Sequence, residues 1–278
     1  MNIKFICTYW GSENLSAKDF LHKVLANGFD GVEINFPDNH LFINEFIVEL
    51  NIIRNSINPN FIFIAQQVLS NQNETVDSYK ERLLHRLKFL TDLNPDAINS
   101  HTGKDHYDFD TNVSIVSLTE EISQKTGIPI WHEIHRGRFT FHLKSLIDYL
   151  KVFPNLKLVA DLSHFCVVSE SDLSDQLELL ARIYPNIQHI HARVGYEQSP
   201  QINHPFAPEW EKYLIRYLNW WTEIIHIQSK NEIELLTITP EFGPFPYMNN
   251  DFITKRPVVN QWELNIQMKN YLQSNLSS

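Results

Sequence analysis

The segment "VADLSHFCV" (159–167) has the composition of a buried strand, yet it contains an acid and an imidazole, Asp161 and His164. Its other side chains are typical of protein interiors, where an unpaired charge costs several kcal/mol. The two polar groups therefore either satisfy each other and the nearby backbone or face a charged partner, for which a metal ion is the usual candidate.

This segment belongs to a series of eight strand-like runs that alternate with amphipathic stretches. The stretches carry apolar residues at i, i+3 and i+4 and begin at Ser, Asp or Thr caps, as helices do. Successive runs start 28 to 36 residues apart, except for a last gap of 48. The runs span 3–10, 31–36, 61–67, 97–103, 128–135, 157–164, 187–195 and 235–243.

Eight strand-then-helix units without a linker predict an α/β protein, a single (β/α)₈ TIM barrel domain over residues 1–278. The alternative is an open doubly wound sheet. That fold usually has fewer units, and a nucleotide-binding member would carry GxGxxG after the first strand, which this sequence lacks.

Composition points to a small-molecule ligand. The net charge is −10 and no block of Lys or Arg occurs, which argues against nucleic acid and against an anionic membrane surface as partners. Cys7 and Cys166 are the only cysteines and form no CxxC pair, so we expect a reducing compartment. With no signal peptide or membrane span recognisable, we expect a cytoplasmic protein, and the sequence leaves oligomerisation open.

Side chains alternate along a strand, which predicts that four titratable residues share one rim of the barrel. Parity places Glu133, Asp161, His191 and Glu241 at the carboxyl ends of four successive strands, where barrel active sites are built. Three close carboxylates without a charge partner in sequence reach would repel one another, and a divalent cation relieves that repulsion. The oxygen-rich set favours Mn²⁺, with Mg²⁺, Co²⁺ and Zn²⁺ as alternatives.

Four short motifs resemble those of the xylose isomerase-like TIM barrels, the sugar phosphate isomerase/epimerase superfamily. They are "HEIHRGR" (132–138), "DLSH" (161–164), "HIHARVG" (189–195) and "PEFG" (240–243), and the resemblance runs over the whole chain. Each motif is short, but their order on successive strands is specific as a set. The resemblance implies that Glu133, Asp161, His191 and Glu241 bind one metal ion, that both glutamates also transfer protons, and that His164 contacts substrate.

Two branches of this superfamily differ from the sequence. The ketose epimerases have an Arg six residues after the His of the seventh strand, which is His191 here, but this chain has Glu197 at that position. The nearest arginine is Arg193, which we therefore take as a candidate for binding substrate. The apurinic endonuclease IV branch has a His where the third strand ends here in Gln66 and Gln67, and the net charge is wrong for DNA. We therefore exclude a nuclease.

Further substrate-binding candidates lie at the same ends of the strands. They are His101, His135 and Arg136, together with His204 in the long irregular segment 195–208, which we interpret as a lid over the ligand. Each has a structural interpretation as well, such as capping a loop or forming a surface ion pair. We expect His132 to face the helices and His189 and Glu33 to point into the barrel.

The leading functional hypothesis is a metal-dependent isomerase or epimerase of a small sugar-like polyhydroxy carbonyl compound. Such a reaction needs a Lewis acid that holds adjacent oxygen atoms and a base on each side of the carbon that loses its proton, roles that Glu133 and Glu241 can fill. A dehydratase of an inositol- or sugar-like substrate would share the first step. A barrel that binds a sugar or a metal without turnover is the non-catalytic alternative.

Overall fold

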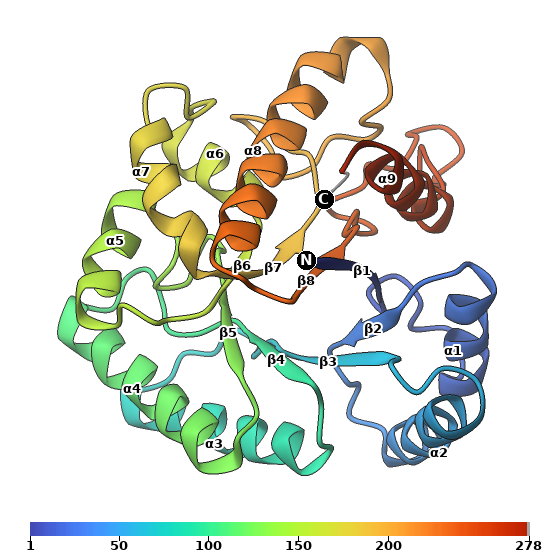
Figure 1. The fold of residues 1–278 in the computed structure, drawn as a ribbon, viewed down its shortest axis with the longest axis horizontal. Helices are drawn as coiled ribbons and strands as arrows, with labels where there is room; N and C mark the ends of the chain where they lie inside the picture. The colour runs from blue at the N-terminus through green and yellow to red at the C-terminus, as the bar shows by residue number, and fades with distance from the viewer. Residues whose placement is uncertain (277–278) are drawn as a thin grey trace.

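The computed structural model describes residues 1–276 as a closed barrel of eight parallel strands, paired in sequence order from β1 to β8 and back to β1. Figure 1 shows the strands at the centre and the helices in a ring around them. The predicted (β/α)₈ TIM barrel is confirmed, because every strand pairs in parallel with its neighbours in the chain.

All eight predicted strands are present. They are β1 (Asn2–Thr8), β2 (Gly31–Ile34), β3 (Ile62–Gln67), β4 (Ala97–Ser100), β5 (Ile130–Glu133), β6 (Leu158–Ala160), β7 (Ile187–His191) and β8 (Leu235–Thr239). The α-helices are α1 (Ala17–Ala26), α2 (His40–Ser56), α3 (Val76–Asp92), α4 (Phe109–Thr126), α5 (Leu143–Val152), α6 (Ser163–Ser169), α7 (Leu177–Ile183), α8 (Glu211–Lys230) and α9 (Gln261–Asn275). Two 3₁₀ turns, η1 (Tyr184–Asn186) and η2 (Pro208–Trp210), precede β7 and α8.

The sixth strand is shorter than the sequence suggested, and His164 lies on helix α6 instead of at a strand end. After β6 the Asp161 carboxylate accepts a hydrogen bond from the Ser163 backbone N–H at 3.2 Å, which turns the chain into the helix. The first turn of α6 is buried on all sides, so it shows no amphipathic period that would separate it from a buried strand.

The barrel interior is polar near its carboxyl-terminal rim. Glu33 on β2 accepts hydrogen bonds from Asn99 of β4 and Thr239 of β8, both at 2.8 Å, and the ring of His189 stacks on Trp131 at 5.7 Å. His132 points the other way, with its Nε2 3.4 Å from Glu120 of α4. The expected directions of Glu33, His132 and His189 are thus confirmed.

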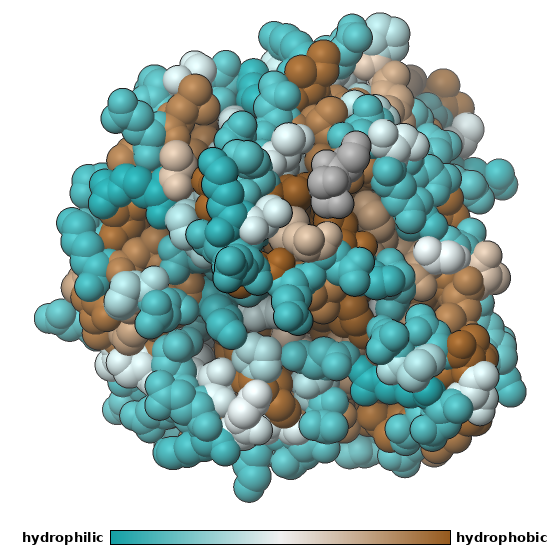
Figure 2. Space-filling view, viewed as in Figure 1, coloured by the Kyte–Doolittle hydropathy of each residue, from teal (hydrophilic) through white to brown (hydrophobic). Residues whose placement is uncertain are grey.

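Outside the barrel, α9 lies between α8 and α1 in the ring of helices (Figure 1). Lys269 of α9 donates to the carbonyl of Gly28 at 3.2 Å, and Lys23 of α1 lies 3.7 Å over the ring of Trp262. The face in Figure 2 is largely hydrophilic, with apolar side chains scattered among polar ones. Among residues 1–276, no helix combines the length and the apolar character that crossing a membrane requires.

Two aspartates connect strand pairs at the amino-terminal end of the barrel. Asp30, just before β2, accepts a hydrogen bond from the Phe5 N–H of β1 at 2.9 Å, and its own N–H donates to the Phe5 carbonyl at 2.8 Å. Asp96, just before β4, makes the same two contacts with Phe63 of β3, at 2.6 and 2.8 Å. Each carboxylate accepts a hydrogen bond from a strand N–H that lies outside the hydrogen-bonded ladder between the two strands.

We predict that Asp96→Ala lowers the free energy of unfolding by about 1–3 kcal/mol, because the Phe63 N–H loses its acceptor. Asp96→Asn keeps an acceptor oxygen and should recover most of the loss. Urea denaturation measures both values. Asp92→Ala, at the exposed end of α3, is the control and should stay within about 0.5 kcal/mol of the wild type. Equal stability of the two alanine variants would contradict this role for Asp96.

Candidate metal centre

The four predicted ligands come together at one rim of the barrel. Glu133 and His191 are the last residues of β5 and β7, Asp161 follows β6 directly, and Glu241 lies two residues beyond the end of β8. One donor atom from each lies within 4.8 Å of the other three. Metal–ligand bonds of about 2.0–2.4 Å place donors on opposite sides of an ion at most about 4.8 Å apart, so the set is compatible with one divalent cation.

The imidazole of His191 is held in one orientation by Glu33. Its Nε2 lies 3.0 Å from both oxygens of Glu33, and its Nδ1 faces Glu241 at 2.9 Å and Glu133 at 3.7 Å. Nδ1 is buried and has no hydrogen-bond partner of good geometry among the described residues. A proton on Nε2 shared with Glu33 leaves the Nδ1 lone pair directed at the centre of the cluster, which is the arrangement of a metal-ligating histidine.

Asp161 has a charge partner that the sequence interpretation missed. Its Oδ2 contacts the guanidinium of Arg193, whose Nη2 also lies 3.6 Å from Glu241 Oε2. The expectation that the cluster has no charge partner in the chain was therefore wrong. Strand parity explains the contact, because Arg193 lies two residues beyond His191 and points to the same side.

Negative charge still exceeds positive charge in this region. The carboxylates of Glu33, Glu133, Asp161 and Glu241 are all buried, and Arg193 is the only Lys or Arg within 4 Å of them in the described part of the chain. A buried excess of carboxylates is costly unless protons or a cation neutralise it. The donor set and its charge therefore fit a divalent metal ion.

The protein groups push the pKa values of the two glutamates apart. Burial favours the neutral form of both, but at Glu133 the nearby His101 and His191 outweigh it and lower the pKa. At Glu241 burial prevails over His191 and Arg193, and the pKa is raised. Two carboxyl groups with separated pKa values can act as a base and an acid in the same site.

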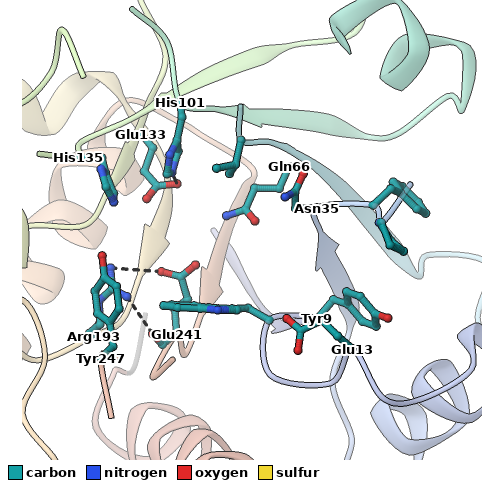
Figure 3. Close-up of a pocket in the computed structure, with 14 residues that line it drawn as sticks. Tyr9, Glu13, Asn35, Gln66, His101, Glu133, His135, Arg193, Glu241 and Tyr247 are labelled. Carbon is teal, nitrogen blue, oxygen red and sulfur yellow. Dashed lines mark hydrogen bonds and ion pairs between the residues drawn. The ribbon is translucent and has the colours of Figure 1, made fainter. Parts of the chain in front are cut away.

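A cavity of about 390 Å³ opens onto the cluster. Glu133 and Glu241 line it, whereas Asp161 and His191 lie behind them, fully buried. Figure 3 shows the two glutamate side chains pointing toward one another across the cavity. The other lining residues are Tyr9, Trp10, Glu13, Asn35, Phe36, Pro37, Gln66, Val68, His101, His135, Arg193 and Tyr247.

Three imidazoles form a row beside Glu133. The ring centroids of His101 and His135 lie 4.4 Å apart, and those of His135 and His164 lie 3.9 Å apart. His101 Nε2 is 3.0 Å from Glu133 Oε2, and burial lowers the pKa of His135 and of His164 well below the usual value. His101 and His135 line the cavity, as predicted for substrate contacts, but His164 lies behind them against Asp161 and Arg193 at 3.4 and 3.2 Å.

The predicted lid does not cover this cavity. In segment 195–208, His204 packs against Phe206, which packs against Tyr271 of α9, and Tyr196 packs against Trp210. None of these residues lines the cavity, so the structure does not bring His204 to the site. Aromatic packing on α8 and α9 holds the segment away from it. Glu197, at the position of the ketose epimerase Arg, pairs with Arg216 of α8 at 3.5 Å.

Sequence reasoning missed the aromatic residues of the cavity, among them Trp10 and Tyr247. The ring of Tyr247 lies 4.8 Å from the Arg193 guanidinium and that of Trp10 lies 5.9 Å from it. Trp10 could have been found, because it ends the first strand-like run. Tyr247 lies in the irregular stretch between β8 and α9, and no periodicity there assigns it to the site. Arg136 donates to the Tyr247 hydroxyl at 3.3 Å and lines a second cavity, not this one.

No family model and no curated protein matches the chain in sequence, but solved structures match it over nearly its whole length. A D-tagatose 3-epimerase-like protein superposes with a TM-score of 0.68 at 17% identity, covering 98% of this chain and 97% of its own. The IolI protein with a zinc atom has a TM-score of 0.65 at 13% identity, covering 98% and 97%. A probable 3-DHS dehydratase, AsbF from Bacillus anthracis, has a TM-score of 0.64 at 16% identity, covering 99% and 100%.

Other matched structures include a D-psicose 3-epimerase with D-tagatose from Clostridium cellulolyticum H10 and a xylose isomerase-like TIM barrel protein from Mycobacterium smegmatis in complex with magnesium. The identities are low, so these likenesses concern the fold. The chain has the fold of the xylose isomerase-like TIM barrel proteins, in agreement with the resemblance of its four motifs.

We predict that the protein binds one divalent ion per chain and that Mn²⁺ raises its melting temperature, since a ligand that binds only the folded state stabilises it. His191→Gln should weaken Mn²⁺ binding by about a hundredfold or more. Glu13→Gln is the control, because Glu13 lines the same cavity outside the cluster and its loss should leave Mn²⁺ binding intact. A wild type that neither contains nor is stabilised by a divalent ion would show that the cluster is not a metal site.

We also predict that Glu33→Gln weakens metal binding about 10- to 100-fold without unfolding the barrel, because Glu33 orients His191 through its Nε2. Isothermal titration with Mn²⁺ measures the affinity. Glu49→Gln removes a buried carboxylate of α2 whose charged partners within residues 1–276 are Lys18 and His22, and this variant should bind Mn²⁺ like the wild type. Unchanged affinity in Glu33→Gln would refute the orienting role.

Proposed function

We propose that the protein is a metal-dependent isomerase or epimerase of a small sugar-like polyhydroxy carbonyl compound. The observation that carries the proposal is that the four members of the cluster differ in their access to the cavity. Of its four members, only Glu133 and Glu241 reach the cavity, and they face one another across it. Those are the two groups to which proton transfer was assigned on sequence grounds.

The cavity suits a substrate of this size and polarity. A volume of about 390 Å³ falls within the range of small-molecule sites. Its walls combine aromatic rings from Tyr9, Trp10 and Tyr247 with amide and imidazole groups from Gln66 and His101. Sugars present hydroxyl groups and apolar C–H faces together, and this mixture of side chains complements both.

Proton transfer follows from the positions of the two carboxyl groups. A base removes the proton next to the carbonyl, and a group on the other face returns a proton there or to the neighbouring carbon. Glu133 and Glu241 face one another across the cavity, so either carboxyl group can accept the proton and the other can return one. His101 Nε2 lies 3.0 Å from Glu133 Oε2 and would stabilise the charge of that carboxylate.

A divalent ion held by Glu133, Asp161, His191 and Glu241 would polarise the substrate carbonyl and stabilise the negative charge of the enediolate. The matched structures in complex with magnesium and with a zinc atom support such an ion in a barrel of this shape. Mn²⁺ remains our choice for this chain, because three oxygen donors accompany one nitrogen.

A dehydratase is the second candidate, and the likeness to a probable 3-DHS dehydratase favours it. The two reactions share proton abstraction and then diverge, because a dehydratase expels hydroxide from the carbon next to the carbanion. NMR in deuterated buffer with added Mn²⁺ separates them on a panel of aldoses, ketoses and inositol-type compounds. Deuterium in the recovered sugar indicates an isomerase or epimerase, loss of water indicates a lyase, and neither indicates a binding protein.

We predict that Glu133→Gln and Glu241→Gln each fold, retain weakened metal binding and lose on the order of 10²-fold or more in turnover, the scale of a lost general acid or base. Each change keeps one oxygen that can face the metal and removes the group that exchanges the proton. Solvent deuterium exchange at the substrate C–H should stop in at least one of the two variants.

Glu49→Gln, far from the cavity on α2, is the control and should turn over at the wild-type rate. Exchange at the wild-type rate in both cavity variants would place the base elsewhere, and His101 would be the next candidate because it lies in hydrogen-bonding range of Glu133.

A further inference from the structure

A second cavity of about 460 Å³ adjoins the first. Its walls come from the segments that follow β3, β4 and β5, at residues 71–74, 104–107 and 135–138, together with Tyr247. His135 and Tyr247 line both cavities. They lie together at one end of the first cavity, away from Tyr9 and Glu13 (Figure 3). A ligand that enters between Glu133 and Glu241 can therefore extend past His135 and Tyr247 into the second cavity.

Three cationic side chains line this second cavity, Lys104, Arg136 and Arg138. Lys104 is 6% exposed and donates its only side-chain hydrogen bond within residues 1–276 to the amide of Asn71, at 2.7 Å. Arg138 is 8% exposed, and its buried Nε has no hydrogen-bond partner in the same range. Arg136, at the rim, donates to Tyr247. None of the three cations has a carboxylate within 4 Å in the described chain.

The two acids of this cavity are already engaged. Glu74 forms a two-pronged ion pair with Arg82, with both contacts at 2.7 Å, and Asp105 lies 3.2 Å from the ring of its neighbour His106. The three cations are therefore left without an ion-pair partner among the described residues, in a chain whose net charge is −10. Burial lowers the pKa of Lys104, and the charge of Arg138 lowers it further, as expected where cations repel one another.

The backbone places both arginines on the cavity. Gly137 between them has a φ of +77°, a conformation that favours glycine, and a Cβ at this position would meet no atom within 4 Å. The turn lets Arg136 and Arg138 line the same cavity from β5, while Lys104 approaches from the neighbouring β4 segment. Guanidinium groups bind carboxylate and phosphate oxygens in pairs, and an ammonium group adds a point charge.

We propose that Lys104, Arg136 and Arg138 form an anion subsite for a phosphate or carboxylate group on the substrate, whose carbonyl end lies between Glu133 and Glu241. The placement of the carbonyl end between Glu133 and Glu241 rests on the proposed function. The anion subsite narrows the substrate to a sugar phosphate or a sugar acid. The anion supplies the negative charge that the three cations lack.

Titration with inorganic phosphate tests the subsite without knowledge of the substrate. Phosphate should raise the melting temperature of the wild type, and Lys104→Met and Arg138→Met should each weaken its apparent affinity tenfold or more. Lys125→Met, on the exposed face of α4, is the matched control and should respond like the wild type. Arg136→Met, at the rim, loses a hydrogen bond to the half-buried Tyr247 and provides a variant that remains folded if the buried ones do not.

All three cavity variants should bind Mn²⁺ with wild-type affinity, which separates loss of the anion subsite from loss of the metal site. The deuterium-exchange panel then includes neutral sugars, sugar phosphates and sugar acids. Preferred exchange with the phosphates or with the acids identifies the anion, and Lys104→Met should raise KM for that class far more than it lowers kcat.

Phosphate that fails to stabilise the wild type, or that stabilises the Lys104 and Arg138 variants equally well, overturns the subsite. So does exchange that prefers neutral sugars and is indifferent to Lys104→Met. If phosphate binds through the three cations but no compound on the panel exchanges its proton, the subsite stands and the proposed isomerase or epimerase activity fails.

Discussion

The arrangement of the site depends on an excess of buried carboxylates around one imidazole. Glu33 contacts Nε2 of His191, and Glu133 and Glu241 face Nδ1 on the other side of the ring. Four carboxylates packed this closely are stable only with compensating charge, and Arg193 supplies one permanent cation, on the side of Asp161. The negative charge that remains in excess lies at the cavity wall. A divalent ion bound there would neutralise this charge and would be accessible to a ligand.

Hydrogen bonds across the barrel interior hold this concentration of charge in place. Asn99 of β4 donates hydrogen bonds to Glu33 and to Glu133, at 2.8 and 2.7 Å, and so connects Glu33 to the predicted metal-binding cluster. Thr239 of β8 adds a hydrogen bond to Glu33 from the opposite wall. Because these donors come from strands, whose positions the ladder determines, the carboxylates cannot relax away from one another, and the site stays preorganised.

The spacing of the strand-like runs predicted the eight strands, and strand parity predicted the convergence of Glu133, Asp161, His191 and Glu241. It failed where a side chain is placed by something other than a strand. His164 lies on a short helix buried on all sides, so its segment had no helical period to recognise. His204 and Tyr247 both lie in long irregular segments, and only tertiary packing decides that the first turns to α9 and the second to the cavity.

The cations of the second cavity would determine how a substrate lies in the site. A polyol held only by a metal ion can bind in either direction, because its two ends offer similar oxygen atoms. An anionic end that extends into the second cavity meets Lys104, Arg136 and Arg138, whereas in the reverse orientation these three cations stay without an anion. The anionic group therefore favours one orientation, so the carbon that faces the two glutamates is selected by a charge that never touches them.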